Sequence, residues 1–184
     1  FMAFSTVGFD KDGIPSSQAG DQDGEFMGIG AAVSADGIHW TKKTNSPLLA
    51  FSGEFGAKNP VPNGDYERPS LMYENGKFKL WFDYLHESKL SASMGYAELT
   101  GSADSNTFFN GTWNIIRSGN NPAFTPMANP DVIRVGNTYY AYGDPAGFGD
   151  GWEWQARKIV EVTSQDGINW SYSGYVDPES GCAA

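Results

Sequence analysis

Apolar and aromatic residues occur in short runs along this chain, and glycine or proline separates one run from the next. Two stretches show the pattern most clearly, 67–84 (ERPSLMYENGKFKLWFDY) and 128–144 (ANPDVIRVGNTYYAYGD). Each reads as a proline, an apolar strand, a turn built from Asn and Gly, and a second, aromatic strand, which is typical of a hairpin. No stretch with helical periodicity exceeds about two turns, so the pattern predicts an all-β protein.

The two hairpins align with one gap, which places Pro69 on Pro130, Leu71-Met72 on Val132-Ile133, and Gly76 on Gly136. Two further strands follow each hairpin, and a shorter version of the unit precedes both. Units of four short strands over roughly 60 residues are typical of β-propeller blades. We therefore predict one propeller domain over 1–184, with an incomplete first blade at 1–56, a second at 57–124 and a third at 125–184.

The motif Ser-x-Asp-Gly-Ile-x-Trp occurs twice, in VSADGIHWTKKT (33–44) and TSQDGINWSYSG (163–174). We interpret it as a turn between the third strand of a blade and its outer fourth strand. Asp-Gly makes the reversal, and the Asp side chain accepts hydrogen bonds from backbone N–H groups of the turn. The Trp side chain packs the turn onto the blade. These residues are therefore expected to be structural.

Charge and composition exclude several kinds of binding partner and site. The formal net charge is −10, which argues against nucleic acid, because phosphate binding needs a basic surface. No apolar run approaches the roughly 20 residues of a membrane span. One Cys and two His exclude a zinc site of the Cys/His kind, and Cys182 is assigned no role. The start of the sequence lacks the features of a signal peptide.

The repeated turn, the inner-strand openings ERPSLM and NPDVI, and the strand GNTYYAYGD resemble the five-bladed propeller glycosidases around glycoside hydrolase families 43, 32 and 130. YERPSLMYENGKFKLWFDY is most similar to the galactanase-type branch of family 43. The resemblance implies hydrolysis of a glycosidic bond by paired carboxyl groups, helped by a third that adjusts the acid's pKa and holds the sugar. It places these groups at the openings of the innermost strands.

Glu67 and Asp131 are the candidate catalytic residues. Glu67 precedes Arg68-Pro69, where the galactanase-type pattern places a pKa-adjusting carboxylate; the alternative is a solvated Glu or an ion-pair partner of Arg68. At the matching position of the third blade this chain has Asn129, an amide that cannot act as a base. Asp131 lies two residues on, and simple alternation puts it on the same strand face as Asn129.

Further residues are expected to bind substrate: Arg68, Asn129, Trp81, Asp83, Tyr84, His86, Asp144 and Trp152. Trp81 and Asp83 share one face of their strand, and Tyr84 lies on the other. An aromatic ring beside the pocket stacks on a sugar; for Trp81 the alternative is packing between blades. Asp144 opens the Gly-rich segment that carries Trp152.

A five-bladed propeller needs about 300 residues, so the printed chain holds an incomplete set of blades. Three interpretations follow: a piece of a complete glycosidase, two chains associated through open blade faces, or a relative that binds sugars without cutting them. We expect an oligo- or polysaccharide partner and an extracellular or periplasmic location. No cofactor is predicted, although a structural Ca²⁺ on the propeller axis is compatible with the pattern.

Overall fold

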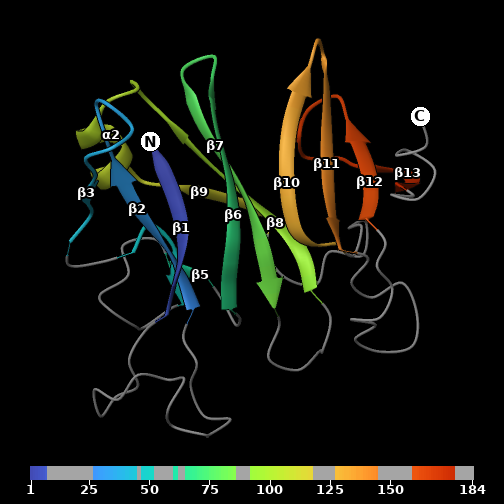
Figure 1. Ribbon diagram of the computed structural model, residues 1–184, viewed down its shortest axis with the longest axis horizontal. Helices are drawn as coiled ribbons and strands as arrows, with labels where there is room; N and C mark the ends of the chain where they lie inside the picture. Colours follow the sequence, from blue (N-terminus) through green and yellow to red (C-terminus); the bar gives the residue numbers. More distant parts are fainter. Residues whose placement is uncertain are drawn as a thin grey trace, which may run out of the picture.

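The computed structural model describes residues 1–7, 27–44, 47–51, 60–61, 65–85, 92–117, 127–144 and 159–176. It is all-β with antiparallel sheets, as the short apolar runs and the turns between them predict. Three sheets lie side by side in chain order, and Figure 1 shows them from left to right.

The first sheet contains β1 (Met2–Val7), β2 (Met27–Val33) and β3 (Thr41–Lys42), in the order β1-β2-β3. A short parallel pair, β4 (Ala50–Phe51) and β5 (Pro60–Val61), lies beside it.

The second and third sheets have four strands each, and each strand pairs with the next one in sequence. The second contains β6 (Asp65–Glu74), β7 (Lys77–Leu85), β8 (Ala92–Thr100) and β9 (Asn114–Arg117), with the short helix α2 (Ser105–Asn110) between β8 and β9. The third contains β10 (Ala128–Val135), β11 (Thr138–Asp144), β12 (Ile159–Ser164) and β13 (Ser171–Val176).

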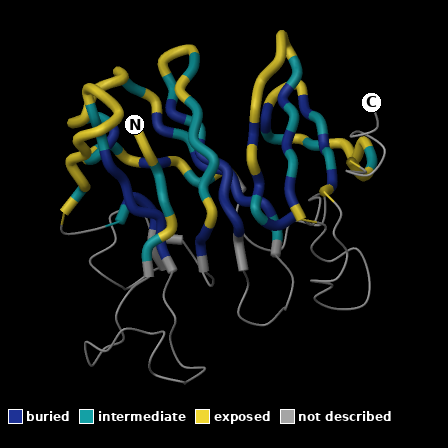
Figure 2. The backbone as a smooth tube through the Cα atoms, in the orientation of Figure 1, coloured by how far each residue is buried: buried dark blue, intermediate teal, exposed yellow. Residues whose placement is uncertain are grey.

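The second sheet is covered on both faces. One apolar cluster joins it to the first sheet, and its largest members are Ile29, Leu48, Leu49, Tyr66, Phe78, Leu80, Phe82, Phe108 and Trp113. The other joins it to the third sheet and contains Trp81, Met94, Tyr96, Met127, Val132, Tyr139, Ala141, Val160 and Val162. Alternation along β7 explains this, because successive side chains point to opposite faces. In Figure 2 the buried residues run through the middle strands and the exposed ones gather at the hairpin tips.

The second and third sheets repeat the same register without a gap. Glu67 lies opposite Asp83 and Ser70 opposite Trp81; in the third sheet Ala128 lies opposite Asp144 and Asp131 opposite Tyr142. Both inner strands carry a bulge at this point. The gap introduced in the sequence alignment is therefore wrong: Arg68 corresponds to Asn129, and Asp83 corresponds to Asp144.

Both Ser-x-Asp-Gly turns form as predicted. Oδ1 of Asp36 accepts the N–H groups of Ile38 and His39, each at 2.8 Å. Oδ1 of Asp166 accepts the N–H groups of Ile168 and Asn169 at 2.8 and 2.7 Å. These bonds hold the pKa of each Asp well below its ordinary value; for Asp36 the largest cause is the His39 side chain.

The two turns differ in what covers them. The carbonyl oxygen of Gly167 accepts the indole N–H of Trp81 from the second sheet at 2.7 Å. A Cβ on Gly167 would lie 3.0 Å from Cζ2 of Trp81, whereas a Cβ on Gly37 would meet nothing within 4 Å. The turn of the third sheet is therefore docked onto its neighbour, and the equivalent turn of the first sheet is open.

An ionic cluster joins the second and third sheets near the hairpin tips. Glu74 accepts hydrogen bonds from Lys79 at 2.5 Å and Arg134 at 2.6 Å, and also from the hydroxyl of Tyr139. Burial would raise the pKa of Glu74, but the bonds from these three side chains outweigh it and lower the pKa to about 2. The ionised form of Glu74 therefore stabilises the contact between the sheets.

We expect Glu74→Gln to lower the free energy of unfolding at pH 7 by up to about 3 kcal/mol. In the unsubstituted chain this stabilisation is present above pH 4.5 and is lost as the pH falls toward about 2. Urea denaturation across this pH range measures it. Lys77→Gln, which removes the more exposed Lys77–Glu98 pair, is the control and should cost less than about 1 kcal/mol. Equal losses in both variants would contradict the assignment.

The two turn glycines supply a second, matched test. Gly37 and Gly167 have φ of +76° and +77°, so alanine is strained equally at both positions. We expect Gly37→Ala to cost about 1 kcal/mol and Gly167→Ala to cost about 1–3 kcal/mol more, because only the second methyl group meets Trp81. Thermal unfolding of both variants measures the difference, and the docked turn is refuted if Gly167→Ala is the milder change.

Candidate functional site

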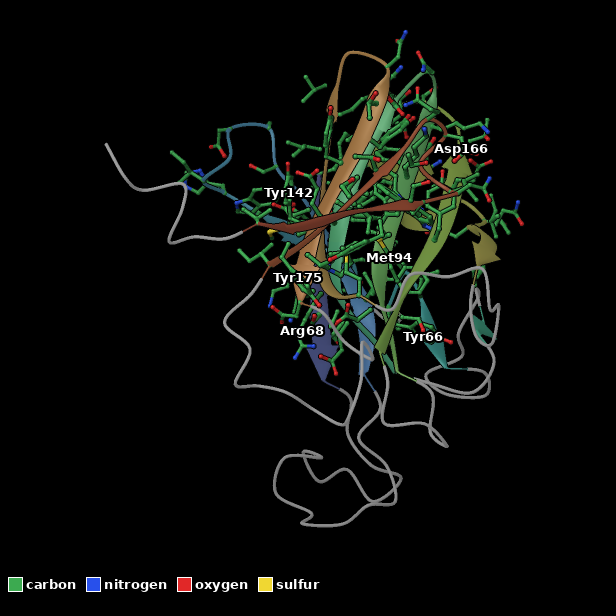
Figure 3. The ribbon with its side chains drawn as sticks, turned by 90° about the vertical axis from the view of Figure 1, so that its right-hand side faces the viewer. Tyr66, Arg68, Met94, Tyr142, Asp166 and Tyr175 are labelled. Atoms are coloured by element: carbon green, nitrogen blue, oxygen red, sulfur yellow. The ribbon has the colours of Figure 1, made fainter. Side chains whose placement is uncertain are left out.

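The candidate site lies at the bulge of β6, where Glu67 and Arg68 stand at the start of the inner strand. Arg68 has φ of +51°, a left-handed conformation that is uncommon for a residue with a side chain. The bulge leaves its backbone N–H outside the ladder with β7, and this N–H donates to Oγ of Ser5 in the first sheet at 2.7 Å. In Figure 3 Arg68 lies in the lower part of the view and Asp166 at the upper right, so the site is separate from the Ser-x-Asp-Gly turn of the third sheet.

Asp83 is the buried acid of the site. Its side chain is 0% exposed, and Nη1 of Arg68 donates to Oδ2 at 3.0 Å. The backbone N–H of Asn129, from the third sheet, donates to Oδ1 at 2.6 Å. Burial raises the pKa of Asp83 to about 6, although the bonds from Arg68 and Asn129 act in the opposite direction. Asp83 therefore binds both the side chain of Arg68 and the backbone of the third sheet.

Glu67 lies directly opposite Asp83 in the ladder and is also buried. Its Oε2 lies 3.4 Å from Nη2 of Arg68, so the same guanidinium faces both carboxyl groups. The side chain of Arg68 is 41% exposed, whereas that of Glu67 is 10% exposed. Arg68 is thus the solvent-facing member of the group, and Glu67 lies at its edge. The ion pair considered as an alternative for Glu67 is present.

The third sheet repeats this arrangement in weaker form. Asn129 has φ of +53° at its own bulge, and its side-chain amide donates to Oδ2 of Asp144, as Arg68 does to Asp83. Asp144 is exposed, because no described element covers it as the third sheet covers Asp83. Ser5 occupies the position in the first sheet that Asp144 occupies in the third. This follows from the strand pairings, because β1 pairs with β2 as β11 pairs with β12 when Ser34 is aligned with Ser164.

The contact between neighbouring sheets therefore recurs. Arg68 N–H donates to Ser5, and Asn129 N–H donates to Asp83. In both cases the bulge residue of one inner strand is bound by a polar side chain of the preceding sheet, on β1 for Ser5 and on the equivalent strand β7 for Asp83. Sequence reasoning missed Ser5 altogether and gave Asp83 no part in joining the sheets. The left-handed residues had no local signal, since the residue before a proline favours extended backbone.

Asp131 does not lie where alternation places it. The bulge between Ala128 and Asp131 interrupts the alternation, so Asp131 and Asn129 do not share a face by that rule. Asp131 is exposed and lies opposite Tyr142. The hydroxyl of Ser70 on β6 lies 3.5 Å from Oδ1 of Asp131 and accepts the N–H of Val132 at 3.0 Å. Asp131 and Glu67 thus lie on neighbouring inner strands, but at different positions along them.

Trp81 requires a correction. It is 0% exposed and packs against Tyr96 and Tyr139, with centroid distances of 5.4 and 6.0 Å. Its indole N–H donates to the carbonyl of Gly167, and because the side chain is fully buried no ring face is available for a sugar. The packing alternative is the one found.

Three other predicted residues are only partly described or not described. The backbone of Tyr84 belongs to β7 and pairs with Tyr66 and Ser93. His86 and Trp152 lie outside the described residues.

Within the ranges that the structure describes, no group of three or more His, Cys, Asp or Glu side chains is arranged to hold a metal ion. Among the same residues, no helix is long and apolar enough to cross a membrane.

Comparisons with known proteins give likenesses to solved structures and no match to a sequence family. No family model matches the sequence, and no curated protein matches it. A solved glycoside hydrolase family 43 β-1,3-galactosidase is similar over 94% of this chain and 49% of that one, with 15% sequence identity and a TM-score of 0.35. The chain therefore spans about half the length of that protein.

The burial of Asp83 predicts an unusual pH dependence. Because its pKa rises from 3.8 to about 6 on folding, the protonated acid is favoured in the folded protein and the ionised form is costly. Relative to Asp83→Asn, we expect the unsubstituted chain to lose up to about 3 kcal/mol of stability as the pH rises from about 4 to about 6. Urea denaturation of both proteins at closely spaced pH values measures this difference. A difference that is independent of pH, or that grows with pH, would rule out the buried acid.

Proposed function

We propose that this chain is part of a carbohydrate-active β-propeller protein and that the full-length protein hydrolyses a glycosidic bond. Like sheets packed face to face, joined by the same inner-strand contact, are what a propeller requires of neighbouring blades. The three sheets would be the three successive blades expected from the repeats.

One observation carries the proposal: Glu67 and Asp83 are paired buried carboxyl groups with one guanidinium between them, at the opening of an inner strand. Burial of two acids is energetically costly, and a buried acid with a raised pKa, as Asp83 has, is typical of functional sites. A sugar would meet the exposed guanidinium of Arg68 first and the carboxylate of Glu67 beside it. Asp83, which is inaccessible, would position Arg68 rather than touch the substrate.

The remaining roles follow from this placement. Glu67 would adjust the general acid and hold a sugar hydroxyl, and Asp131 on the neighbouring inner strand would be the second acid of the pocket. Asn129 and Asp144 would offer an amide and a carboxylate to sugar hydroxyls. Tyr84, His86 and Trp152 stay proposed binding residues. An extracellular or periplasmic location would suit an oligo- or polysaccharide substrate.

A second candidate function is sugar binding without hydrolysis. The observation that favours it is the pair Asn129–Asp144, an exposed amide and carboxylate that offer hydrogen bonds to a sugar at the opening of the third sheet. A module of this kind would bind an oligosaccharide through hydrogen bonds at the sheet openings and leave it intact.

Galactan oligosaccharides are the first substrates to test, because the galactanase-type pattern of residues 66–84 suggests them. We expect Glu67→Gln in the full-length protein to lower turnover by at least about a hundredfold, the scale of a lost acid–base role. Release of reducing ends measures turnover, and calorimetry measures binding of the same oligosaccharides.

Glu98→Gln is the matched control. It changes a carboxyl group on β8 of the same sheet that is paired with Lys77 and not with Arg68, and it should leave turnover unchanged. Equal turnover in Glu67→Gln and the unsubstituted protein would remove Glu67 from the mechanism. Binding without any release of reducing ends would favour the second candidate, and the absence of both would refute carbohydrate recognition of these sugars.

A further inference from the structure

Four pairs of asparagine or aspartate followed by glycine fall within the described residues, and each has the atoms needed to form a cyclic imide. They are Asp36-Gly37, Asn75-Gly76, Asn110-Gly111 and Asp166-Gly167. In such a pair the backbone nitrogen of the glycine attacks the side-chain carbonyl carbon and closes a five-membered succinimide. The nitrogen must give up its proton to react, so a glycine N–H that is held by an acceptor inside the protein is protected.

Both Ser-x-Asp-Gly turns hold their glycine N–H groups. Gly37 donates to Oγ of Ser34 at 2.8 Å. Gly167 donates to Oγ of Ser164 at 2.9 Å. The pKa of the Asp in each turn lies well below its ordinary value, so the carboxyl group is ionised and resists attack by a nitrogen. Both turns are therefore protected at the nitrogen and at the carboxyl group.

The pair at the end of the helix α2 is protected by hydrogen bonds and by packing. The N–H of Gly111 donates to the carbonyl oxygen of Thr107 at 2.8 Å, and the side-chain amide of Asn110 donates to Oδ1 of Asn106 at 3.0 Å. A Cβ on Gly111 would lie 2.5 Å from Cδ1 of Leu99, so the backbone here is tightly packed. Reaction at Asn110 would first have to break these contacts.

The Asn75-Gly76 pair is open at the reacting atoms. It forms the two-residue turn between β6 and β7, with φ of +51° and +74°, as a type I′ hairpin turn requires. Both residues are exposed, and within the part of the chain that the structure describes the N–H of Gly76 has no acceptor. A Cβ on Gly76 would meet nothing within 4 Å, so the turn has space to rotate. Figure 2 shows the tip of this hairpin exposed, although sheets lie on both sides of it.

We propose that Asn75 deamidates spontaneously in the folded protein, and that it does so faster than the other three pairs react. The nitrogen of Gly76 attacks Cγ of Asn75, and its proton passes through solvent to the leaving amide group, which departs as ammonia. Water then opens the succinimide at either carbonyl and gives aspartate or isoaspartate at position 75. The net reaction exchanges ammonia for water and involves no change of oxidation state.

The modification alters the ionic cluster between the second and third sheets. Glu74 precedes Asn75, lies opposite Lys77 across the turn, and binds Arg134 from the third sheet. Isoaspartate adds one carbon to the main chain of a two-residue turn, which displaces Glu74 relative to Lys77. Aspartate keeps the length of the turn but places a second negative charge beside Glu74. Both products should therefore weaken the contact through which Glu74 joins the two sheets.

Incubation of the folded chain at mildly alkaline pH, followed by peptide mapping with mass spectrometry, tests the proposal. Methylation by an isoaspartyl methyltransferase, with S-adenosylmethionine as the methyl donor, identifies isoaspartate. We expect Asn75 to convert at least about tenfold faster than Asn110, the scale of one intact hydrogen bond. In urea the two asparagines should convert at similar rates, because each is followed by glycine and neither is protected. The pair Asn63-Gly64 lies outside the described residues and is followed as a separate peptide.

Asn75→Gly is the matched variant, because glycine accepts the positive φ of this turn and has no side chain to react. After the same incubation, the urea midpoint should fall further in the unsubstituted chain than in Asn75→Gly, and equal falls would refute the effect on the ionic cluster. Isoaspartate that appears in the folded chain first at Asp36, Asn110 or Asp166 would overturn the proposal. So would an Asn75 that reacts in urea but stays intact in the folded chain. The outcome does not depend on whether the protein acts on sugars.

Discussion

The hydrogen bond between a bulge N–H and a side chain of the preceding sheet is the contact on which the arrangement of this molecule depends. A bulge leaves one backbone N–H outside the strand ladder, and this N–H is then available to an acceptor from another sheet. At Arg68 the acceptor is Ser5, and at Asn129 it is Asp83. Each inner strand is thereby held against the sheet before it, and apolar clusters fill the space between the sheets.

The choice of acceptor links the fold to the proposed chemistry. Ser5 accepts the N–H as a neutral hydroxyl, whereas Asp83 brings a charge into a buried position. A carboxylate forms the stronger bond, but it requires a cation nearby when it ionises. Arg68 is that cation, and its Nη1 donates to Oδ2 of Asp83 from the bulge of the neighbouring strand. The group that holds the sheets together therefore also fixes the guanidinium that faces solvent.

Local patterns were sufficient to predict the hairpins, the all-β fold and the hydrogen bonds of both Ser-x-Asp-Gly turns. They were not sufficient at the bulges, because nothing in Arg68-Pro69 or Asn129-Pro130 indicates a left-handed residue. The alignment gap that matched Gly76 with Gly136 then hid the equivalence of Asp83 and Asp144. Alternation misplaced Asp131 because of the bulge before it. Alternation also does not reveal that another sheet covers the face that carries Trp81.

The second sheet is enclosed between two apolar clusters, and this has a consequence for how the molecule comes apart. Loss of β6–β9 would expose both clusters at once, so that sheet can open only together with its neighbours. The outer strands β3 and β13 each touch one sheet and can separate alone. Amide protons of β7 should therefore exchange with solvent only through global unfolding, and cooperativity should decrease outward from the centre.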